Sequence, residues 1–257
     1  MVTGNAMAIV KAARSDSKIT AKEIIKEVFS DFIEFHGDRK GTDDPAIFGG
    51  LALFSSIPVT VIATNRGETV SEHSSTHFGC PTPGGYRKAL RLAKQAAKFN
   101  RPIIFLVNTP GAYPGKTAEE QGQGSAIAQN IIQIGQLPVP IITIIYGEGG
   151  SGGALALACG DQVWMLENST YSILSPEGFA SILWKDGSRT EEAAELMQIT
   201  PSVLLRHKII EGIISESEDH KETCQAVTNV LAKQLHKLMK LSRSDLLIKR
   251  KERYRKF

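Results

Sequence analysis

The sequence predicts an α/β protein with a largely parallel β-sheet covered by helices. Short apolar runs alternate with segments of helical periodicity through the middle of the chain. Most of these runs are apolar at successive positions, which is typical of strands buried on both faces of a sheet. The chain has 257 residues, of which 42% are hydrophobic and 22% charged, enough for one large domain. We expect a single domain over residues 1–257, with its core at about 36–215 and helical arms at 1–35 and 216–257.

The strands are expected at short apolar runs bounded by turn residues. They are residues 47–54, 59–65, 103–108 and 140–147, and two short strands within 162–176. Only Ser-Ser-Ile-Pro separates the first two runs, so we expect them to be adjacent in the sheet.

The helices are expected where apolar residues recur with a period near 3.6. They are residues 5–35, 83–101 and 117–137, a segment after the glycines near residue 150, and most of the chain from Glu191 onward. Ser17 or Thr20 is suited to cap the first helix, and Thr117 with Glu120 forms a capping-box pattern. Residues 66–82 contain many Ser, His, Thr and Gly residues and predict a loop.

Composition argues against several classes of protein. The net charge of +3 is too small to indicate nucleic-acid binding. No apolar stretch has the roughly 18 residues that a membrane span needs, and no signal core is present, so we expect a cytoplasmic protein. Cys80, Cys159 and Cys224 show no C-x-x-C pattern, while His73 and His77 lie in the predicted loop. We therefore expect no metal site.

A glycine-rich turn between a predicted strand and a predicted helix has the most chemical content. Gly149, Gly150, Gly152 and Gly153 surround Ser151. Glycines let a ligand approach the main chain closely, and the first turn of a helix exposes unpaired N–H groups with a partial positive charge. These residues are therefore candidates for an anion or oxyanion site. A tight turn that serves only packing is the alternative.

Two other glycine motifs, the P-loop and the nucleophile elbow, could also apply to this turn. A P-loop requires Lys followed by Ser or Thr after its last glycine, where this chain has Ala-Leu. Residues 149–153 match the nucleophile-elbow pattern G-x-S-x-G around Ser151. A serine hydrolase would also need a downstream acid and histidine. His207 and His220 lie downstream, but neither sits in a motif that suggests a triad, and the hydrolase stays an alternative.

A second candidate site directly follows the predicted strand at 103–108. Its residues are Thr109, Pro110, Gly111, Ala112 and Tyr113. Ligands of α/β proteins bind at the carboxyl ends of strands, and prolines with glycines make a rigid, shaped loop. We therefore expect a substrate-binding loop here, with a simple turn as the alternative.

Basic side chains form a stripe on the predicted helix that follows Pro83. The stripe comprises Arg87, Arg91, Lys94, Lys98 and Arg101. Phosphates of a coenzyme or an acidic partner surface would suit it, which makes Arg87 and Arg91 candidate substrate-binding residues. A solvated helix face is the alternative. We expect the basic run at 249–256 to be a solvated tail.

Five segments, read together, resemble the alpha subunits of bacterial acetyl-CoA carboxylase carboxyltransferase. They are FHGDR (35–39), the segment from FG to RP (78–102), TPGAYPG (109–115), GEGGSGGALAL (147–157) and STYSILSPEGFASILWKD (169–186). The resemblance implies the crotonase-like fold of the ClpP/crotonase group, a spiral of ββα units, here with helical arms at both ends. Asn108 departs from the family pattern, which often has Asp there, and the segment 215–224 diverges.

The resemblance also implies a reaction, cofactors and partners. The family transfers the carboxyl group from carboxybiotin on the biotin carboxyl carrier protein to acetyl-CoA, giving malonyl-CoA in the first committed step of fatty acid synthesis. Its members pair with a beta subunit as α2β2 and work with biotin carboxylase. Zinc is expected only on the beta subunit, and biotin is not attached to this chain.

By the same resemblance, backbone N–H groups around Gly152 and Gly153 would hold the ureido oxygen of biotin, while the partner holds the thioester enolate. Glu148, directly before the glycines, is a further candidate substrate-binding residue. One rival is a self-sufficient crotonase-like acyl-CoA hydratase or hydrolase, which would need a carboxylate such as Glu119, Glu120 or Glu148. The other is a non-catalytic scaffold that binds the carrier protein.

Overall fold

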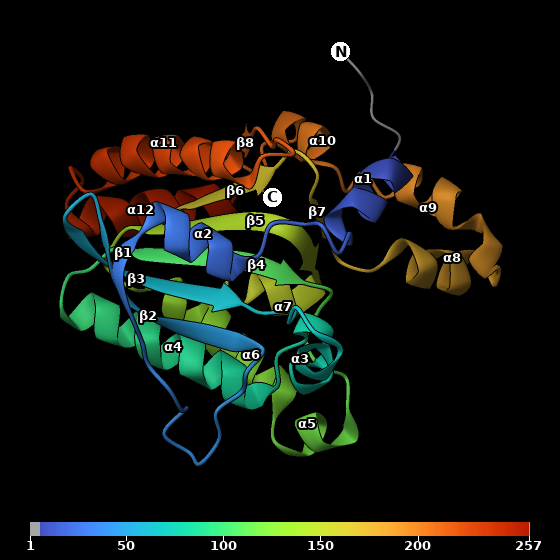
Figure 1. The fold of residues 1–257 in the computed structure, drawn as a ribbon, viewed down its shortest axis with the longest axis horizontal. Coiled ribbons are helices and arrows are strands. Elements are labelled where there is room, and N and C mark those ends of the chain that lie inside the picture. The colour runs from blue at the N-terminus through green and yellow to red at the C-terminus, as the bar shows by residue number, and fades with distance from the viewer. Residues whose placement is uncertain (1–5, 257) are drawn as a thin grey trace.

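The computed structural model describes residues 6–256 and has three layers, with a β-sheet between two layers of helices (Figure 1). Within these residues the sheet has eight strands in the order β1-β2-β3-β4-β5-β6-β8, with β7 beside β5. The strands are β1 (Ser30–Glu34), β2 (Ile47–Phe54), β3 (Ile57–Thr64), β4 (Ile103–Thr109), β5 (Ile141–Gly150), β6 (Gln162–Leu166), β7 (Thr170–Ser172) and β8 (Gly212–Ile214). Residues 1–5 and 257 of the predicted arms lie outside the described residues.

The pairing of the strands confirms the predicted, largely parallel sheet. Strands β3, β4, β5, β6 and β8 run parallel, while β1, β2 and β3 are antiparallel neighbours. Every residue of β4 and β5 is buried, because helices cover both faces of these central strands. The adjacent strands predicted from the first two apolar runs are β2 and β3.

One face of the sheet packs against α2 and α11, with Leu246 of α12, and the other packs against α4, α6, α7 and α10 (Figure 1). The helices on the first face are α2 (Ala21–Val28), α11 (His220–Leu238) and α12 (Arg243–Tyr254). Those on the second face are α4 (Pro83–Lys98), α6 (Gln123–Ile134), α7 (Ser151–Leu155) and α10 (Pro201–Arg206). Among the described residues, none of the helices has the length and apolar character that a membrane crossing requires.

The carboxyl ends of β4 and β5 meet at one end of the sheet, where Thr109 pairs with Gly149. Helices α1 (Ala6–Ala13), α8 (Pro176–Trp184) and α9 (Thr190–Leu196) project beyond this end, on the right of Figure 1. Val10 and Ile199 join a small apolar cluster that ties α1 to this region. Both loops predicted to bind a ligand therefore begin at the same end of the sheet.

The predicted helix over residues 5–35 is partly wrong. Helices α1 and α2 are present, and Thr20 caps α2 in a complete capping box with Glu23. The last part instead forms β1, antiparallel to β2. The two strands approach so closely that a side chain at Gly50 would collide with the backbone of Ile33. Pairing across the sheet, which local periodicity does not report, overrides the helical pattern here.

Three further local predictions are wrong. The predicted helix 117–137 is two helices, α5 (Lys116–Glu120) and α6, because Gly122 between them has a left-handed φ of 83°. Gly115 rather than Thr117 caps α5, and no side chain completes the predicted capping box. Residues 66–82, predicted as a loop, contain α3 (Val70–Ser75) and a 3₁₀ turn at His77–Gly79.

The predicted solvated tail at 249–256 is also wrong. Arg250 and Arg253 are only 2% and 8% exposed. Arg250 forms an ion pair with Asp161 at 2.8 Å, and Arg253 pairs with Glu211 at 2.7 Å. One face of α12, with Leu246, Arg250 and Arg253, is therefore buried against the protein, and the basic run partly anchors the helix.

Candidate functional site

The glycine turn joins the end of β5 to the start of α7. Ser151, the first residue of α7, has a left-handed φ of 52°, which non-glycine residues adopt at a cost of about 1–2 kcal/mol. Gly150 touches the neighbouring loop so closely that a side chain there would collide with the carbonyl group of Pro110. Glycine is thus required where the turn and the loop at 109–113 meet.

The next two glycines differ in their surroundings. A Cβ at Gly153 would lie 2.5 Å from the nitrogen of Ala112 and 2.7 Å from the hydroxyl of Tyr86. A Cβ at Gly152 would lie 3.6 Å from Ile127 at its nearest contact, which is ordinary packing. Within residues 6–256 no side chain caps α7, so the backbone N–H groups at its first turn are left for another partner.

The loop at 109–113 is held rigidly beside this turn. The Thr109 hydroxyl donates to the Gly111 carbonyl at 2.8 Å, and Gly111 has a φ of 147° that only glycine adopts readily. The Tyr113 ring stacks on His77, with ring centroids 4.0 Å apart. Gln123 of α6 donates to the Tyr113 carbonyl at 3.0 Å. The structure therefore brings together the two loops predicted separately from the sequence.

Glu148 lies beside the turn in a network of ion pairs. Its carboxylate accepts from Arg14 at 2.7 Å and from Arg66 at 3.1 Å. Arg14 also donates to Glu177 at 2.7 Å, and this hydrogen bond is the main reason that the pKa of Glu177 lies below its usual range. Sequence reasoning missed both arginines, because neither lies in a motif and both reach Glu148 only through the tertiary fold.

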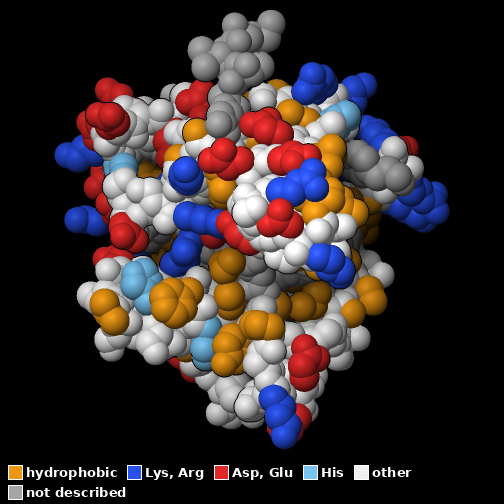
Figure 2. Space-filling model, turned by 90° about the vertical axis from the view of Figure 1, so that its right-hand side faces the viewer, with side chains coloured by type: hydrophobic (Ala, Val, Ile, Leu, Met, Phe, Trp, Pro, Cys, Tyr) orange, Lys and Arg blue, Asp and Glu red, His pale blue; other side chains and the backbone are white. Residues whose placement is uncertain are grey.

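A hollow opens at this end of the molecule. Figure 2 shows it face-on, lined with hydrophobic side chains, between the part that carries α1, α8 and α9 and the part that carries α3 and α5. Ser151, Gly152 and Leu155 form one wall of a cavity of about 740 Å³, and Ile173, Phe179, Ile199 and His207 are among its other lining residues. The accessible side of the glycine turn therefore faces an apolar cavity large enough for a small ligand.

Two predicted substrate-binding residues lie elsewhere. Arg87 donates to Asp38 at 2.7 Å, and Arg91 donates to the Gly37 carbonyl at 2.9 Å. Both line a groove between α4 and α6 rather than the hollow beside Gly152. The structure does not join them to the glycine turn.

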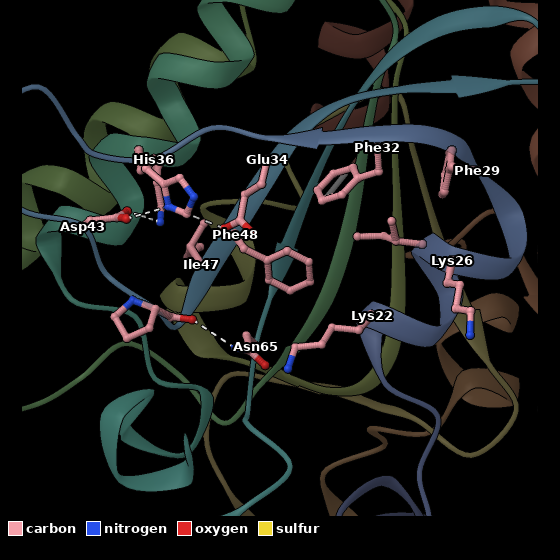
Figure 3. Close-up of a pocket in the computed structure, with 13 residues that line it drawn as sticks. Lys22, Lys26, Phe29, Phe32, Glu34, His36, Asp43, Ile47, Phe48 and Asn65 are labelled. Atoms are coloured by element: carbon pink, nitrogen blue, oxygen red, sulfur yellow. Dashed lines mark hydrogen bonds and ion pairs between the residues drawn. The ribbon is translucent and has the colours of Figure 1, made fainter. Parts of the chain in front are cut away.

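A third cavity, of about 610 Å³, lies between α2 and the hairpin of β2 with β1 (Figure 3). Phe29, Phe32 and Phe48 line it, with Lys22 and Lys26 at one side. It contains none of the residues predicted as site residues, so we assign it no part in the chemistry at the turn.

The predicted alternative of a serine hydrolase has one supporting feature. Ser151 is exposed and stands on a strained strand-to-helix turn, as in a nucleophile elbow. His207 lines the same cavity, but its Nε2 hydrogen-bonds to the Gln198 amide oxygen at 3.1 Å. Within residues 6–256 no histidine hydrogen-bonds to Ser151, so the hydroxyl has no base.

Ser151→Gly should therefore leave turnover nearly unchanged. Glycine adopts the left-handed conformation without strain, so we expect the free energy of unfolding to change by no more than about 1 kcal/mol. Steady-state rates and thermal melting measure both. If Ser151 were a nucleophile, removal of its hydroxyl would lower kcat by about 10⁶-fold. A loss of that size would show that the serine hydrolase is the correct interpretation.

Metal ligation has no candidate in this region. Within residues 6–256 no group of three or more His, Cys, Asp or Glu side chains is placed to hold a metal ion. His73 stacks on Phe78 and His77 stacks on Tyr113.

Solved structures share this fold. Transcarboxylase 12S matches with a TM-score of 0.69 and 19% identity over 86% of this chain and 43% of that one. The beta subunit of P. aeruginosa geranyl-CoA carboxylase matches with a TM-score of 0.62 and 20% identity over 84% and 42%. This chain thus spans about two fifths of each structure. At these identities the match shows the fold alone, and this fold is the crotonase-like one that the resemblance implied.

Relatives of higher identity specify the family. The protein named acetyl-coenzyme A carboxylase carboxyl transferase subunit alpha from Streptococcus thermophilus is 53% identical over 97% of this chain and 98% of the relative. The protein of the same name from Streptococcus pneumoniae is 50% identical over 98% and 100%. A family model described as acetyl co-enzyme A carboxylase carboxyltransferase-like matches residues 4–257. The chain belongs to this family and is a transferase component.

Proposed function

We propose that this chain is the alpha half of an acetyl-CoA carboxyltransferase, which moves a carboxyl group from carboxybiotin to acetyl-CoA and forms malonyl-CoA. The turn from β5 into α7 supports this proposal best. Its first N–H groups have no side-chain cap, and Gly152 leaves space for a ligand on the side of the apolar cavity. Such donors stabilise an oxygen on which negative charge develops.

The chemistry needs an oxyanion site more than an acid or base in this chain. Carboxybiotin supplies the carboxyl group: its nitrogen–carbon bond breaks, a carbon–carbon bond forms at the methyl carbon, and the methyl proton goes to the biotin nitrogen. The N–H groups at Gly152 and Gly153 would stabilise charge on the ureido oxygen, and the loop at 109–113 would shape the site around it. Thr109, Pro110, Gly111, Ala112 and Tyr113 have this shaping role.

The carboxylates near the turn argue against the alternative hypothesis of a self-sufficient hydratase or hydrolase. Glu148 is committed to ion pairs with Arg14 and Arg66 and is not a free base. Glu119 and Glu120 lie on α5 and are exposed, with Glu120 3.7 Å from Lys116. No acid is thus poised beside the turn for general acid–base catalysis.

Charge develops on two oxygens in this reaction, and residues 6–256 present one such turn, from β5 into α7. We therefore propose that a beta subunit of similar fold supplies the second oxyanion site in an α2β2 assembly. The biotin carboxyl carrier protein would deliver carboxybiotin to the hollow, and biotin carboxylase would recharge it. Zinc would belong to the beta subunit. A cytoplasmic location goes with this function.

An exposed apolar face beside the cavity would dock the beta subunit. Ile173, Ile182, Leu183 and Leu196 are 85%, 63%, 56% and 57% exposed. They lie just after β7 and on α8 and α9, next to the apolar cavity that Gly152 lines. A group of large exposed apolar side chains is typical of an interaction site.

Ile182→Asp should weaken assembly with the beta subunit, because a charge would be buried against an apolar partner. We expect a loss of at least about 2 kcal/mol, roughly 30-fold in Kd. Analytical ultracentrifugation measures it. Ile248→Asp is the matched control, since Ile248 is 54% exposed on α12. Equal assembly of the two variants would refute this docking face.

Reconstitution tests the function itself. The chain is mixed with the beta subunit, a carboxybiotin donor and acetyl-CoA, and malonyl-CoA is measured. We expect product only when both subunits are present. Malonyl-CoA formation by this chain alone would overturn the shared site.

A further inference from the structure

A groove of about 470 Å³ runs between α4, α6 and the loop at 38–42, and the proposed function does not use it. Lys40, Arg91 and Lys94 form one wall. Ser125, Gln129 and Gln133 of α6 form the other, spaced four residues apart so that they share one helix face. Cations therefore face neutral hydrogen-bonding groups across the groove.

The positive charge in the groove is not neutralised by the protein. Among the described residues, Asp38 is the only acidic one that lines the groove, and it is paired with Arg87 at 2.7 Å. Burial alone would raise the pKa of Asp38, but hydrogen bonds from the backbone of Thr42 and Lys40 and from Arg87 hold it below its usual range. Within the described part of the chain, Lys40, Arg91 and Lys94 form no ion pair with a carboxylate.

Arg91 is positioned rather than free to move. Its Nε donates to the Gly37 carbonyl at 2.9 Å, and one terminal nitrogen donates to the backbone carbonyl of His36 at 3.1 Å. Burial is the main reason that its pKa is lowered; repulsion from the neighbouring Arg39 lowers it further, and attraction to Asp43 and Asp38 offsets part of this. An anion in the groove would relieve this repulsion.

The floor of the groove has spare hydrogen-bonding capacity. Asn130 lines the groove and is fully buried. Neither its side-chain nitrogen nor its oxygen has a hydrogen-bond partner among residues 6–256. Buried amides without partners are uncommon in folded proteins. Ligand or water groups that reach the floor would satisfy a donor and an acceptor together.

Helix α6 separates this groove from the glycine turn. Ile127 packs towards Gly152, with 3.6 Å between its methyl group and a Cβ placed there. Ser125 and Gln129 are two residues away on either side and so lie on the opposite face of the helix. The groove is therefore a site of its own.

We propose that the groove between α4 and α6 binds a nucleoside phosphate. Its phosphates would lie against Lys40, Arg91 and Lys94, and its sugar hydroxyls or base would hydrogen-bond to the amides of α6. A fixed guanidinium suits a phosphate, and amide donors and acceptors suit hydroxyl and base groups. The volume is in the range of small-molecule sites. A free nucleotide and the nucleotide part of coenzyme A share this chemistry.

Calorimetric titration of the full chain with ADP, coenzyme A and inorganic phosphate tests this proposal. We expect saturable binding of ADP, of coenzyme A or of both, with inorganic phosphate at least about tenfold weaker. Lys94→Glu should weaken nucleotide binding by about tenfold or more, since it replaces attraction by repulsion. Binding should also weaken as salt is raised. Tighter binding of coenzyme A than of ADP would identify the coenzyme as the source, and the reverse would identify the free nucleotide.

Lys98→Glu is the matched control, because Lys98 is exposed one turn further along α4 and does not line the groove. Equal nucleotide affinity of the Lys94 and Lys98 variants would overturn the proposal, as would the absence of saturable binding by all three probes. Binding of inorganic phosphate as tight as that of ADP would also overturn it. If an acidic peptide bound in a Lys94-dependent manner and ADP did not, the groove would be a protein-docking site instead. Thermal melting of each variant confirms that it is folded.

Discussion

Gly153→Val should lower malonyl-CoA formation by about 10²–10³-fold or more, the loss typical when one oxyanion-hole donor is removed. The Cβ atom of any side chain at this position would lie 2.5 Å from the nitrogen of Ala112 and 2.7 Å from the Tyr86 hydroxyl. The backbone of α7 would have to move away from the loop at 109–113, and its first N–H groups would no longer point at the oxyanion. Rates with the beta subunit, carboxybiotin and acetyl-CoA measure the loss.

Controls separate this effect from general misfolding. Gly124→Ala adds a methyl group where no atom lies within 4 Å, so its rate and melting temperature should match the wild type. Gly152→Ala meets only Ile127, at 3.6 Å, and should remain folded. A Gly153→Val variant that assembles with the beta subunit and turns over at the wild-type rate would refute the oxyanion assignment.

Arg250→Met should destabilise the chain by about 3–5 kcal/mol, because Asp161 would be left buried without its ion-pair partner. The two side chains are 2% and 5% exposed. Arg250 also donates to backbone carbonyls that would lose their partner, those of Ile134, Gly135, Leu137 and Val139. For a domain of this size the melting temperature should fall by about 10 °C.

Two further variants define the origin of that loss. Lys249→Met also removes one positive charge, but at an exposed neighbouring residue. It should lower the free energy of unfolding by less than about 0.5 kcal/mol. The double variant Arg250→Met with Asp161→Leu should recover part of the stability, because the protein then buries two apolar side chains instead of a lone charge. If the Arg250→Met and Lys249→Met variants had the same melting temperature, α12 would be a peripheral helix rather than an anchor.

The strands and the glycine turn were predictable because their signals are local. Buried strands such as β4 and β5 are continuous apolar runs, and a cluster of glycines after a strand is visible without any knowledge of distant residues. The resemblance of five segments also indicated the family, which the comparisons confirmed. The roles of Gly152, Gly153 and the loop at 109–113 stay predictions.

The rest depended on residues far apart in the chain. The pairing of Arg14 and Arg66 with Glu148 spans 134 and 82 positions, and no spacing rule connects such residues. The basic run of α12 has the composition of a tail, yet Arg250 meets Asp161 inside the protein. The helical spacing of Arg87 and Arg91 predicts a stripe suited to substrate phosphates, but only the tertiary structure shows that α6 separates their groove from the glycine turn.

The sequence by itself determined the class of fold, the buried strands and the glycine turn, since apolar periodicity and the backbone freedom of glycine act over a few residues. Only the tertiary structure decided that residues 30–34 form a strand, that Gly122 breaks a helix, and which cations are paired. The physical reason is that these outcomes depend on the free energy of contacts between distant segments, which exceeds the small local preference of each residue.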